Sequence, residues 1–330
     1  MLDILTRIRQ LVAEKEQFAM ATVVKTWRSS PRQAGSCLVV TKSGQMIGSV
    51  SGGCVENAVV TKALKVLETG QSELVKFGIA NEDAWEVGLS CGGEVWVHIS
   101  PFYQADLWRN LDSSISSNTG VAVLTNISEG SHQLLDVSAS AGDELTNLAL
   151  TQYKHRANSL LSFEGADYFV HSFPPKNKML LIGSAHITAE LIDLAHAYDF
   201  ETIVIDPRDT FAHKTDFQTA PDTLHVNWPQ EVLGDYTLDN ETYAVILSHD
   251  PKIDDEALKI LLPSDVRYIG ALGSRKTQAK RIDRLKGYGF TDEQINRVKG
   301  PIGLNIGAMT AKEIALSVIA EVVKVKNGVD

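Results

Sequence analysis

Two of the three cysteines in this sequence stand beside paired glycines. Cys54 closes the run Ser51–Cys54 (SGGC), which leads into a predicted helix, and Cys91 opens the run Cys91–Gly93 (CGG). Consecutive glycines let backbone N–H groups form a concavity that binds anions, and a helix N-terminus adds positive potential. A thiol in such a setting gains thiolate character, and thiolates select soft metals. We therefore expect Cys54, Cys91 or both to contact a soft metal or a sulfur-bearing ligand.

Other interpretations of these cysteines stay open. The two thiols could form a regulatory disulfide, or they could be inert packing residues. A structural zinc site is not expected, because the sequence has no CxxC pair or neighbouring histidine pair to supply four ligands. The third cysteine, Cys37, opens an apolar strand and is expected to be a buried spacer. Arg32, in the loop Ser29–Gly35 (SSPRQAG), is a candidate for contact with a phosphate.

A second group of chemically capable residues lies in the last half of the chain. The run Ile182–His186 (IGSAH) follows an apolar strand, and Gly183 fits the first glycine of a dinucleotide-binding turn. Ala185 stands where the second glycine would lie, which adds a methyl group at the closest approach to pyrophosphate. Asp206 ends the next strand, where an acid would hydrogen-bond a ribose hydroxyl, and Arg208 could instead meet a phosphate. The alternative is that Asp206 and Arg208 only terminate a strand.

His186 and His249 are predicted at the same edge of a parallel sheet. His186 opens the helix after the glycine turn, and His249 follows a buried strand. Two further loops, Gly273–Arg275 (GSR) and Pro301–Leu304 (PIGL), also follow apolar runs. Open α/β sheets bind ligands along the carboxyl ends of their strands, so these loops together predict a nucleotide-like or pterin-like ligand. For His186, a purely structural role is an equal alternative.

The elements that would position these residues differ between the two halves. Residues 1–177 are predicted to form an amphipathic helix followed by strands and helices of mixed order, and the part from 105 to 177 is poorly defined. The segment Pro174–Asn177 (PPKN) is the strongest boundary signal. From 178 to 330 strands and helices alternate, which predicts a doubly wound parallel sheet. The fold class is therefore α/β, with an N-terminal mixed α/β domain and a C-terminal Rossmann-like domain.

Composition narrows the class of protein. The chain has 330 residues, 44% hydrophobic and 22% charged, which is ordinary for a globular protein of about two domains. Its net charge of −10 argues against a nucleic-acid partner, because such a partner needs a basic surface. Three cysteines indicate a reducing, cytoplasmic compartment. No apolar run approaches the roughly 20 residues that span a bilayer, and the N-terminal residues are expected to form a packing helix and not a signal peptide.

Taken together, the glycine-rich motifs resemble those of the XdhC/CoxI family of accessory factors for molybdenum hydroxylases. In the first half the resemblance rests on SSPRQAG (29–35), GSVSGGCVE (48–56) and GLSCGGE (88–94). In the second half it rests on IGSAH (182–186), IDPR (205–208), SHD (248–250), YIGALGSR (268–275) and PIGLNIGA (301–308). The sequence departs from the family's usual glycine at Ala185.

The resemblance implies a protein that binds molybdenum cofactor (molybdopterin), protects it during sulfuration and delivers it to an apo molybdenum hydroxylase of the xanthine dehydrogenase type. It also implies a homodimer and contact with a cysteine desulfurase. Cys54 and Cys91 become the first candidates for cofactor or metal contact. Backbone contacts to the phosphate or pterin are implied for the four glycines beside them, Gly52, Gly53, Gly92 and Gly93.

The residues themselves favour a carrier over an enzyme, since they include no nucleophile with a paired base and no metal-hydrolase triad. One alternative is an oxidoreductase, or a xanthine dehydrogenase-associated subunit, that uses NAD(P) in the second half. Fold analogy alone is weak support for such an activity. Another alternative is an interaction scaffold whose pockets bind nothing.

Overall fold

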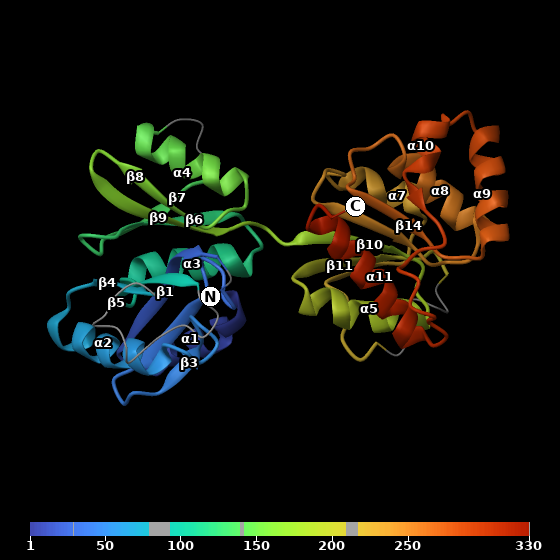
Figure 1. Cartoon of the computed structure of the whole chain (residues 1–330). Coiled ribbons are helices and arrows are strands. Elements are labelled where there is room, and N and C mark those ends of the chain that lie inside the picture. Colours follow the sequence, from blue (N-terminus) through green and yellow to red (C-terminus); the bar gives the residue numbers. More distant parts are fainter. Residues whose placement is uncertain (29, 79–92, 139–141, 209–216, 330) are drawn as a thin grey trace. The chain divides into compact units, whose positions relative to one another are not determined.

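The computed structural model describes residues 1–28, 30–78, 93–138, 142–208 and 217–329. The chain divides into two compact units, Met1–Pro175 and Lys176–Asp330, here named unit 1 and unit 2. Figure 1 shows unit 1 in blue to green and unit 2 in yellow to red. Each unit has hydrophobic clusters of its own.

The first sheet of unit 1, sheet A, has five strands in the order β3-β2-β1-β5-β4, each antiparallel to its neighbours. Its strands are β1 (Phe18–Trp27), β2 (Cys37–Thr41), β3 (Met46–Gly48), β4 (Glu73–Phe77) and β5 (Glu94–Pro101). The register of β1 against β5 shifts between Val23 and Lys25. Helix α2 (Glu56–Thr69) covers one face of the sheet, where Val59 packs with Val97.

The second sheet of unit 1, sheet B, has four antiparallel strands in the order β7-β6-β9-β8. Its strands are β6 (Val121–Asn126), β7 (His132–Leu135), β8 (Ser159–Phe163) and β9 (Ala166–Phe173). The other helices of unit 1 are η1 (Leu2–Ile4), α1 (Leu5–Ala13), α3 (Ala105–Ser116) and α4 (Glu144–Lys154). One hydrophobic cluster joins α1, α3 and both sheets through Ile8, Leu111, Val39 and Val123. The two sheets therefore belong to one packed unit.

Unit 2 contains a parallel sheet of six strands in the order β12-β11-β10-β13-β14-β15. The strands are β10 (Asn177–Ile182), β11 (Phe200–Ile205), β12 (Thr223–His225), β13 (Thr242–Ile246), β14 (Tyr268–Ala271) and β15 (Val298–Lys299). The helices are α5 (His186–Ala197), α7 (Pro229–Val232), η3 (Leu233–Asp235), α8 (Pro251–Leu261), α9 (Arg275–Gly287), α10 (Asp292–Asn296) and α11 (Ala311–Lys326). The chain builds outward from β10 in one direction and then from β13 in the other, as in dinucleotide-binding folds. The predicted Rossmann-like sheet is confirmed.

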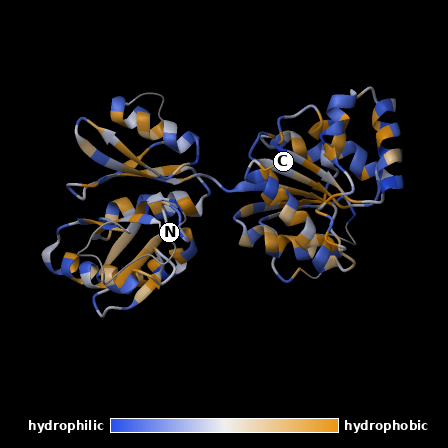
Figure 2. Cartoon of the chain, in the orientation of Figure 1, coloured by the Kyte–Doolittle hydropathy of each residue, from blue (hydrophilic) through white to orange (hydrophobic). Residues whose placement is uncertain are grey.

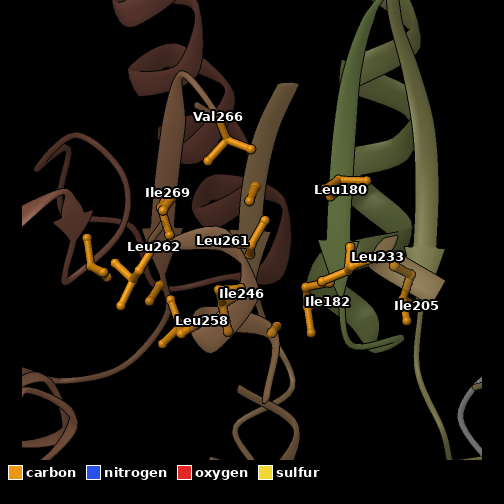
Figure 3. Packing of buried hydrophobic residues seen from close by; sticks show 14 of the residues in the cluster. Leu180, Ile182, Ile205, Leu233, Ile246, Leu258, Leu261, Leu262, Val266 and Ile269 are labelled. Atoms are coloured by element: carbon orange, nitrogen blue, oxygen red, sulfur yellow. The ribbon is translucent and has the colours of Figure 1, made fainter. Parts of the chain in front are cut away.

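Helices cover both faces of this sheet, so alternate strand residues enter two separate cores. Leu180 and Ile182 pack with the side chains of α8, whereas Met179 and Leu181 pack with those of α5 and α11. Figure 3 shows the first of these cores, with Leu258 of α8 near Ile246 of β13. In Figure 2 the strands at the centre of unit 2 are mostly hydrophobic, and hydrophilic residues concentrate on the helices around them.

The structure also bears on the predicted N-terminal helix and on region 105–177. The predicted amphipathic N-terminal helix is confirmed as α1, in which Ile8 and Leu11 are buried. The poorly defined region 105–177 forms α3, sheet B and α4. Within the described parts of the chain, none of the helices has the length and apolar character needed to cross a bilayer.

Candidate functional site

Three motif-bearing connections leave sheet A at the same end. Strands β1, β3 and β4 run in one direction, because β1 and β3 both pair antiparallel with β2, and β1 and β4 both pair antiparallel with β5. The connections that follow these strands, residues 28–36, 49–55 and 78–93, therefore start from one end of the sheet. At this end Trp27 of β1 pairs with Glu94 of β5. The described residues of the unit 1 motifs thus lie at one end of sheet A.

Glu56, the first residue of α2, holds loop 49–55 in shape. It is 8% exposed. Its carboxylate accepts five hydrogen bonds at 2.5–3.2 Å, from the hydroxyls of Ser49 and Ser51 and from the backbone N–H groups of Val50, Ser51 and Gly53. Burial raises the pKa of the Glu56 carboxyl, but the hydrogen bonds from Ser51 and Ser49 outweigh burial and lower it to about 2. Glu56 is therefore ionised at neutral pH.

The two glycines of this loop have backbone conformations that other residues rarely adopt, with φ of 79° at Gly52 and 116° at Gly53. The Gly52 N–H donates to Ser49 Oγ at 2.8 Å, and the Gly53 N–H donates to Glu56 Oε2 at 2.9 Å. These donors are used within the loop, which differs from the predicted anion-binding concavity. The reason is that Glu56 places a negative charge at the N-terminus of α2, where it takes the role expected of a ligand. Cofactor contact by the glycines stays a prediction.

Cys54 is exposed, and it lies in this loop two residues before α2. A methyl group built on Gly52 would lie 3.6 Å from the ring of Pro31, so the loops after β1 and β3 lie against each other. The exposed thiol is therefore presented by a loop that is bonded internally and supported by its neighbour.

Arg32 joins the same two loops. Its Nε donates to the Ser49 carbonyl at 3.1 Å, and its Nη2 pairs with Asp3 Oδ2 at 2.8 Å. The guanidinium has a carboxylate partner here, and its contact with a phosphate stays a prediction. Arg32 thus supports the loop that carries Cys54.

The other predicted residues of unit 1 are placed only in part. Cys91 and Gly92 lie outside the described residues, so their cofactor and metal contacts stay predictions. Gly93 is buried directly before β5. Cys37 is completely buried, as predicted, and its Sγ lies 3.6 Å from Thr22 Oγ1.

In unit 2, Gly183 lies at the point where the strand order reverses between β10 and β13. Its φ is 108°, and a Cβ built on it would lie 2.6 Å from both the N and the Cα of Ser248. The glycine is therefore required for close contact with the loop after β13. The sequence pattern alone indicates a different reason, the approach of a nucleotide.

Asp206 and Arg208 bind each other. Asp206 is completely buried, and its carboxylate accepts from the Ser184 N–H at 2.7 Å and from Arg208 Nε and Nη2 at 2.9 and 2.8 Å. These bonds raise the pKa of Arg208. Arg208 also donates to the Ser248 carbonyl at 3.3 Å, which ties the ends of β11 and β13 together. Asp206 and Arg208 thus bind each other, whereas the sequence pattern predicts that Asp206 binds a ribose and Arg208 a phosphate.

The histidines predicted at the carboxyl edge of the sheet are both exposed. His186 opens α5, and His249 follows β13 with a φ of 60°. The loops that follow β14 and β15 leave the sheet at the same edge, since all six strands are parallel. The predicted convergence of loops at this edge is therefore present, and its ligand stays a prediction.

A buried charge network below this edge was not foreseen from the sequence. Asp254 of α8 accepts from Ser248 Oγ at 2.5 Å and pairs with Arg281 Nη2 at 3.3 Å. Arg281 of α9 is 1% exposed. Burial raises the pKa of Asp254, although the bond from Ser248 and the charge of Arg281 oppose that rise. The only sequence signal was an acid in the first turn of a helix after a buried strand.

The described part of the chain contains no preformed set of metal ligands. Within residues 1–28, 30–78, 93–138, 142–208 and 217–329, no three His, Cys, Asp or Glu side chains are placed to hold a metal ion. Cys91 is not among these residues. A metal contact by Cys54 and Cys91 therefore stays a prediction.

Two family models match this chain. The model of the XdhC and CoxI family matches residues 11–78, and the model of the XdhC Rossmann domain matches residues 179–322. The chain belongs to the XdhC/CoxI family. The first match contains Arg32 and the loop that carries Cys54, and the second contains the carboxyl edge of unit 2.

Curated relatives of this XdhC/CoxI protein align along most of its length. It is 27% identical over 331 residues to a Bacillus subtilis protein named as a probable xanthine dehydrogenase subunit, with 98% of each chain covered. It is 24% identical over 308 residues to the molybdenum cofactor insertion chaperone PaoD of Escherichia coli, with 93% of this chain and 83% of that one covered. A crystal structure described as a xanthine dehydrogenase from Bacillus halodurans has a TM-score of 0.76 at 24% identity, covering 98% of this chain and 95% of that one. The last comparison shows a shared fold.

Proposed function

We propose that this XdhC/CoxI protein binds molybdenum cofactor in unit 1, protects it during sulfuration and delivers it to an apo molybdenum hydroxylase of the xanthine dehydrogenase type. The observation that carries the proposal is the exposed Cys54 thiol on a loop whose polar groups are already bonded to Glu56. Thiolates bind soft metals, so this loop presents one suitable ligand. A relative named as a molybdenum cofactor insertion chaperone gives independent support.

The chemistry of the cargo fits the groups that unit 1 exposes. Molybdenum cofactor has a phosphate, a pterin and a sulfur-ligated metal, and the metal is the part that suits a thiol. Cys54 would contact this part, and Cys91 is proposed to join it because its motif belongs to the connection that leaves sheet A at the same end. Gly52, Gly53, Gly92 and Gly93 would let a bulky ligand approach the backbone, since they carry no side chains.

The proposal includes the partners that delivery requires. The protein would contact the apo hydroxylase that receives the cofactor and a cysteine desulfurase that supplies sulfur, and it would act as a homodimer. A thiol that binds a soft metal must stay reduced, so we place the protein in the cytoplasm.

The alternative function, an NAD(P)-dependent oxidoreductase, is less well supported by the geometry of unit 2. An acid that binds ribose must offer its carboxylate to the ligand, whereas Asp206 is completely buried and bonded to Ser184 and Arg208. His186, His249 and Gly183 stay candidates for a ligand at this edge of the sheet. No step of the proposed delivery depends on such a ligand.

The proposal can be tested by cofactor content and transfer. The full chain is purified anaerobically from cells that make molybdenum cofactor, its molybdenum and pterin are quantified, and an apo hydroxylase is reconstituted with it. We expect bound cofactor in the wild type and a loss of about tenfold or more in Cys54→Ala and Cys91→Ala. Cys37→Ala is the matched control, because this thiol is completely buried in sheet A.

Two results would overturn the proposal. One is a wild-type protein that carries neither molybdenum nor pterin and binds NAD(P) tightly instead. The other is full reconstitution of the hydroxylase by the Cys54→Ala, Cys91→Ala double variant, which would favour a scaffold.

A further inference from the structure

A tryptophan flanked by two lysines stands at the motif-bearing end of sheet A. Trp96 of β5 pairs in register with Lys25 of β1 on one side and with Lys76 of β4 on the other. The Nζ atoms of Lys25 and Lys76 lie 4.5 Å and 3.7 Å from the centroid of the Trp96 ring. Cation–π attraction holds both ammonium groups at this ring. Positive charge is thus concentrated here on a chain whose net charge is −10.

A pocket of about 260 Å³ opens beside this ring, lined by Lys25, Thr26, Trp27, Glu94 and Trp96. Trp27 is 56% exposed, and the Arg28 guanidinium lies 4.3 Å from the centroid of its ring. Glu94 Oε1 accepts from Trp96 Nε1 at 2.8 Å, which fixes the orientation of the Trp96 indole. The pocket therefore combines two indole rings, one carboxylate and three neighbouring cations.

The position of the pocket connects it with the family motifs. Trp27 and Arg28 come directly before the SSPRQAG motif, and Glu94 is the last residue of the GLSCGGE motif. Trp96 packs against Val24 and residues of sheet B, so the pocket is on the sheet face opposite α2. Loop 49–55 uses its own backbone donors on Glu56 and offers no cation to an anionic ligand. The cations beside Trp96 and Trp27 supply what that loop lacks.

We propose that this pocket binds a planar heterocycle that carries an anionic substituent, and, resting on the function proposed above, that its ligand is the pterin of molybdenum cofactor, whose phosphate supplies the negative charge. The heterocycle stacks on the exposed Trp27 ring, because indole faces bind flat aromatic systems of many kinds. Lys25, Lys76 and Arg28 balance the negative charge of the substituent. Glu94 accepts hydrogen bonds from ring N–H groups, which a pterin has and a purely aliphatic anion lacks.

The size of the pocket limits the ligand. Pockets for whole drug-sized ligands run from about 300 to 1,000 Å³, so this one suits a single ring system. A complete dinucleotide would not be enclosed. The pocket therefore recognises one end of a larger ligand and leaves the rest of that ligand outside.

The test is a fluorescence titration of the full chain with pterin-6-carboxylate, a planar anion that contains neither molybdenum nor a dithiolene. We expect Trp27→Ala to weaken binding by about tenfold or more, the usual loss when one stacking ring is removed. Trp27→Phe should restore part of the affinity, since a smaller ring remains. The Lys25→Gln, Lys76→Gln double variant should weaken binding of pterin-6-carboxylate more than binding of uncharged pterin.

Trp228→Ala is the matched control, because Trp228 is 38% exposed and belongs to unit 2. It should bind the probe as the wild type does, and Cys54→Ala should do the same because the probe offers no metal. The pocket is ruled out if the wild type does not bind the probe, or if Trp27→Ala binds it with unchanged affinity.

The failure of this inference can be told apart from the failure of the proposed function. If the purified protein carries no molybdenum cofactor but binds the probe through Trp27, the function fails and the heterocycle pocket stands. If molybdenum cofactor copurifies equally with wild type and Trp27→Ala, the pocket fails and the function stands.

Discussion

Two glycine turns, one in each unit, direct their backbone donors to different buried carboxylates. Loop 49–55 gives N–H groups to Glu56, which follows the loop in sequence. The turn after β10 gives the Ser184 N–H to Asp206, which lies at the end of the neighbouring strand. Glu56 is stabilised by hydroxyl and N–H donors, whereas Asp206 also has the Arg208 guanidinium at 2.8 Å. Both turns look like ligand-binding turns in the sequence, and both satisfy their donors internally.

The difference between these carboxylates decides what each turn can offer a ligand. In unit 2, Arg208 neutralises Asp206 and also bonds to the loop after β13, so the turn ties three strands together. In unit 1, the described bonds of the Glu56 carboxylate all come from loop 49–55, and Cys54 stays exposed. The turn of unit 2 is thus built for strand geometry, and the loop of unit 1 is built to present a thiol.

Removing the unit 1 carboxylate should have the largest effect. Glu56→Ala is expected to lower the free energy of unfolding of unit 1 by roughly 3–5 kcal/mol, because each buried donor left without a partner costs about 1–3 kcal/mol. Urea denaturation followed by tryptophan fluorescence measures this change. A loss below about 1 kcal/mol would mean that the loop does not depend on Glu56.

The two glycines with the largest φ in these turns should differ in their tolerance of a methyl group. Gly183→Ala is expected to lower the free energy of unfolding by about 3 kcal/mol or more. The added Cβ would lie 2.6 Å from the Ser248 backbone, and residue 183 has a φ of 108°. Residue 53 has a φ of 116°, but nothing lies within 4 Å of a Cβ built there. Gly53→Ala is therefore expected to lower the free energy of unfolding by about 1–2 kcal/mol. Denaturation of the two variants side by side measures the difference, and equal losses would refute the close approach at Ser248.

The ion pair of unit 2 should show a measurable coupling. A double-mutant cycle with Asp206→Ala and Arg208→Ala is expected to give about 1–3 kcal/mol, because Asp206 is buried while solvent screens the partly exposed Arg208. Lys286 and Asp292 form the matched exposed pair, at 2.9 Å, and should couple more weakly than Asp206 and Arg208. Equal coupling in the two pairs would show that burial of Asp206 adds nothing.

The smallest effect should come from a change that keeps the shape of Glu56. Glu56→Gln is expected to cost about 1–2 kcal/mol at pH 7, because an amide nitrogen replaces one accepting oxygen. The pKa of Glu56 is lowered in the folded protein from 4.5 to about 2, so its ionisation stabilises the fold above pH 4.5 and this stabilisation is lost as the pH falls through 2. The gap between wild type and variant should therefore close below pH 4.5. A gap that stays constant in urea titrations from pH 7 to pH 2 would contradict the lowered pKa.

Much of the fold follows from sequence patterns, and the reason is visible in particular elements. Continuous apolar runs such as Met179–Ile182 are buried on both faces of a parallel sheet, so their pattern is unambiguous. Two strands of sheet B, β7 and β8, are only partly buried, and β8 (Ser159–Phe163) has no fully buried residue. Such short strands leave a weak pattern, which explains why the sequence defines region 105–177 poorly.

The candidate site was predicted less completely than the fold. At these turns the structure depends on which side chain bonds to which backbone group, and the sequence pattern does not show this. The pattern Ser51–Glu56 shows a glycine pair and a helix start, but it does not show that the Glu56 side chain turns back to the loop. Asp206 and Arg208 were both selected as functional, and their mutual bond decides their role. Trp96 with its two lysines was missed, since only the strand register places Lys25 and Lys76 on either side of it.

The internal bonding of loop 49–55 also affects how cargo is exchanged. Because Glu56 fixes the loop before a ligand arrives, a ligand at Cys54 does not have to order the backbone and loses no binding free energy to that step. Release likewise needs no refolding of the loop. Under the proposed function, the time that cargo spends on the protein is then set by the strength of the contacts themselves and by competition from the receiving enzyme, which suits a carrier that must give up what it holds.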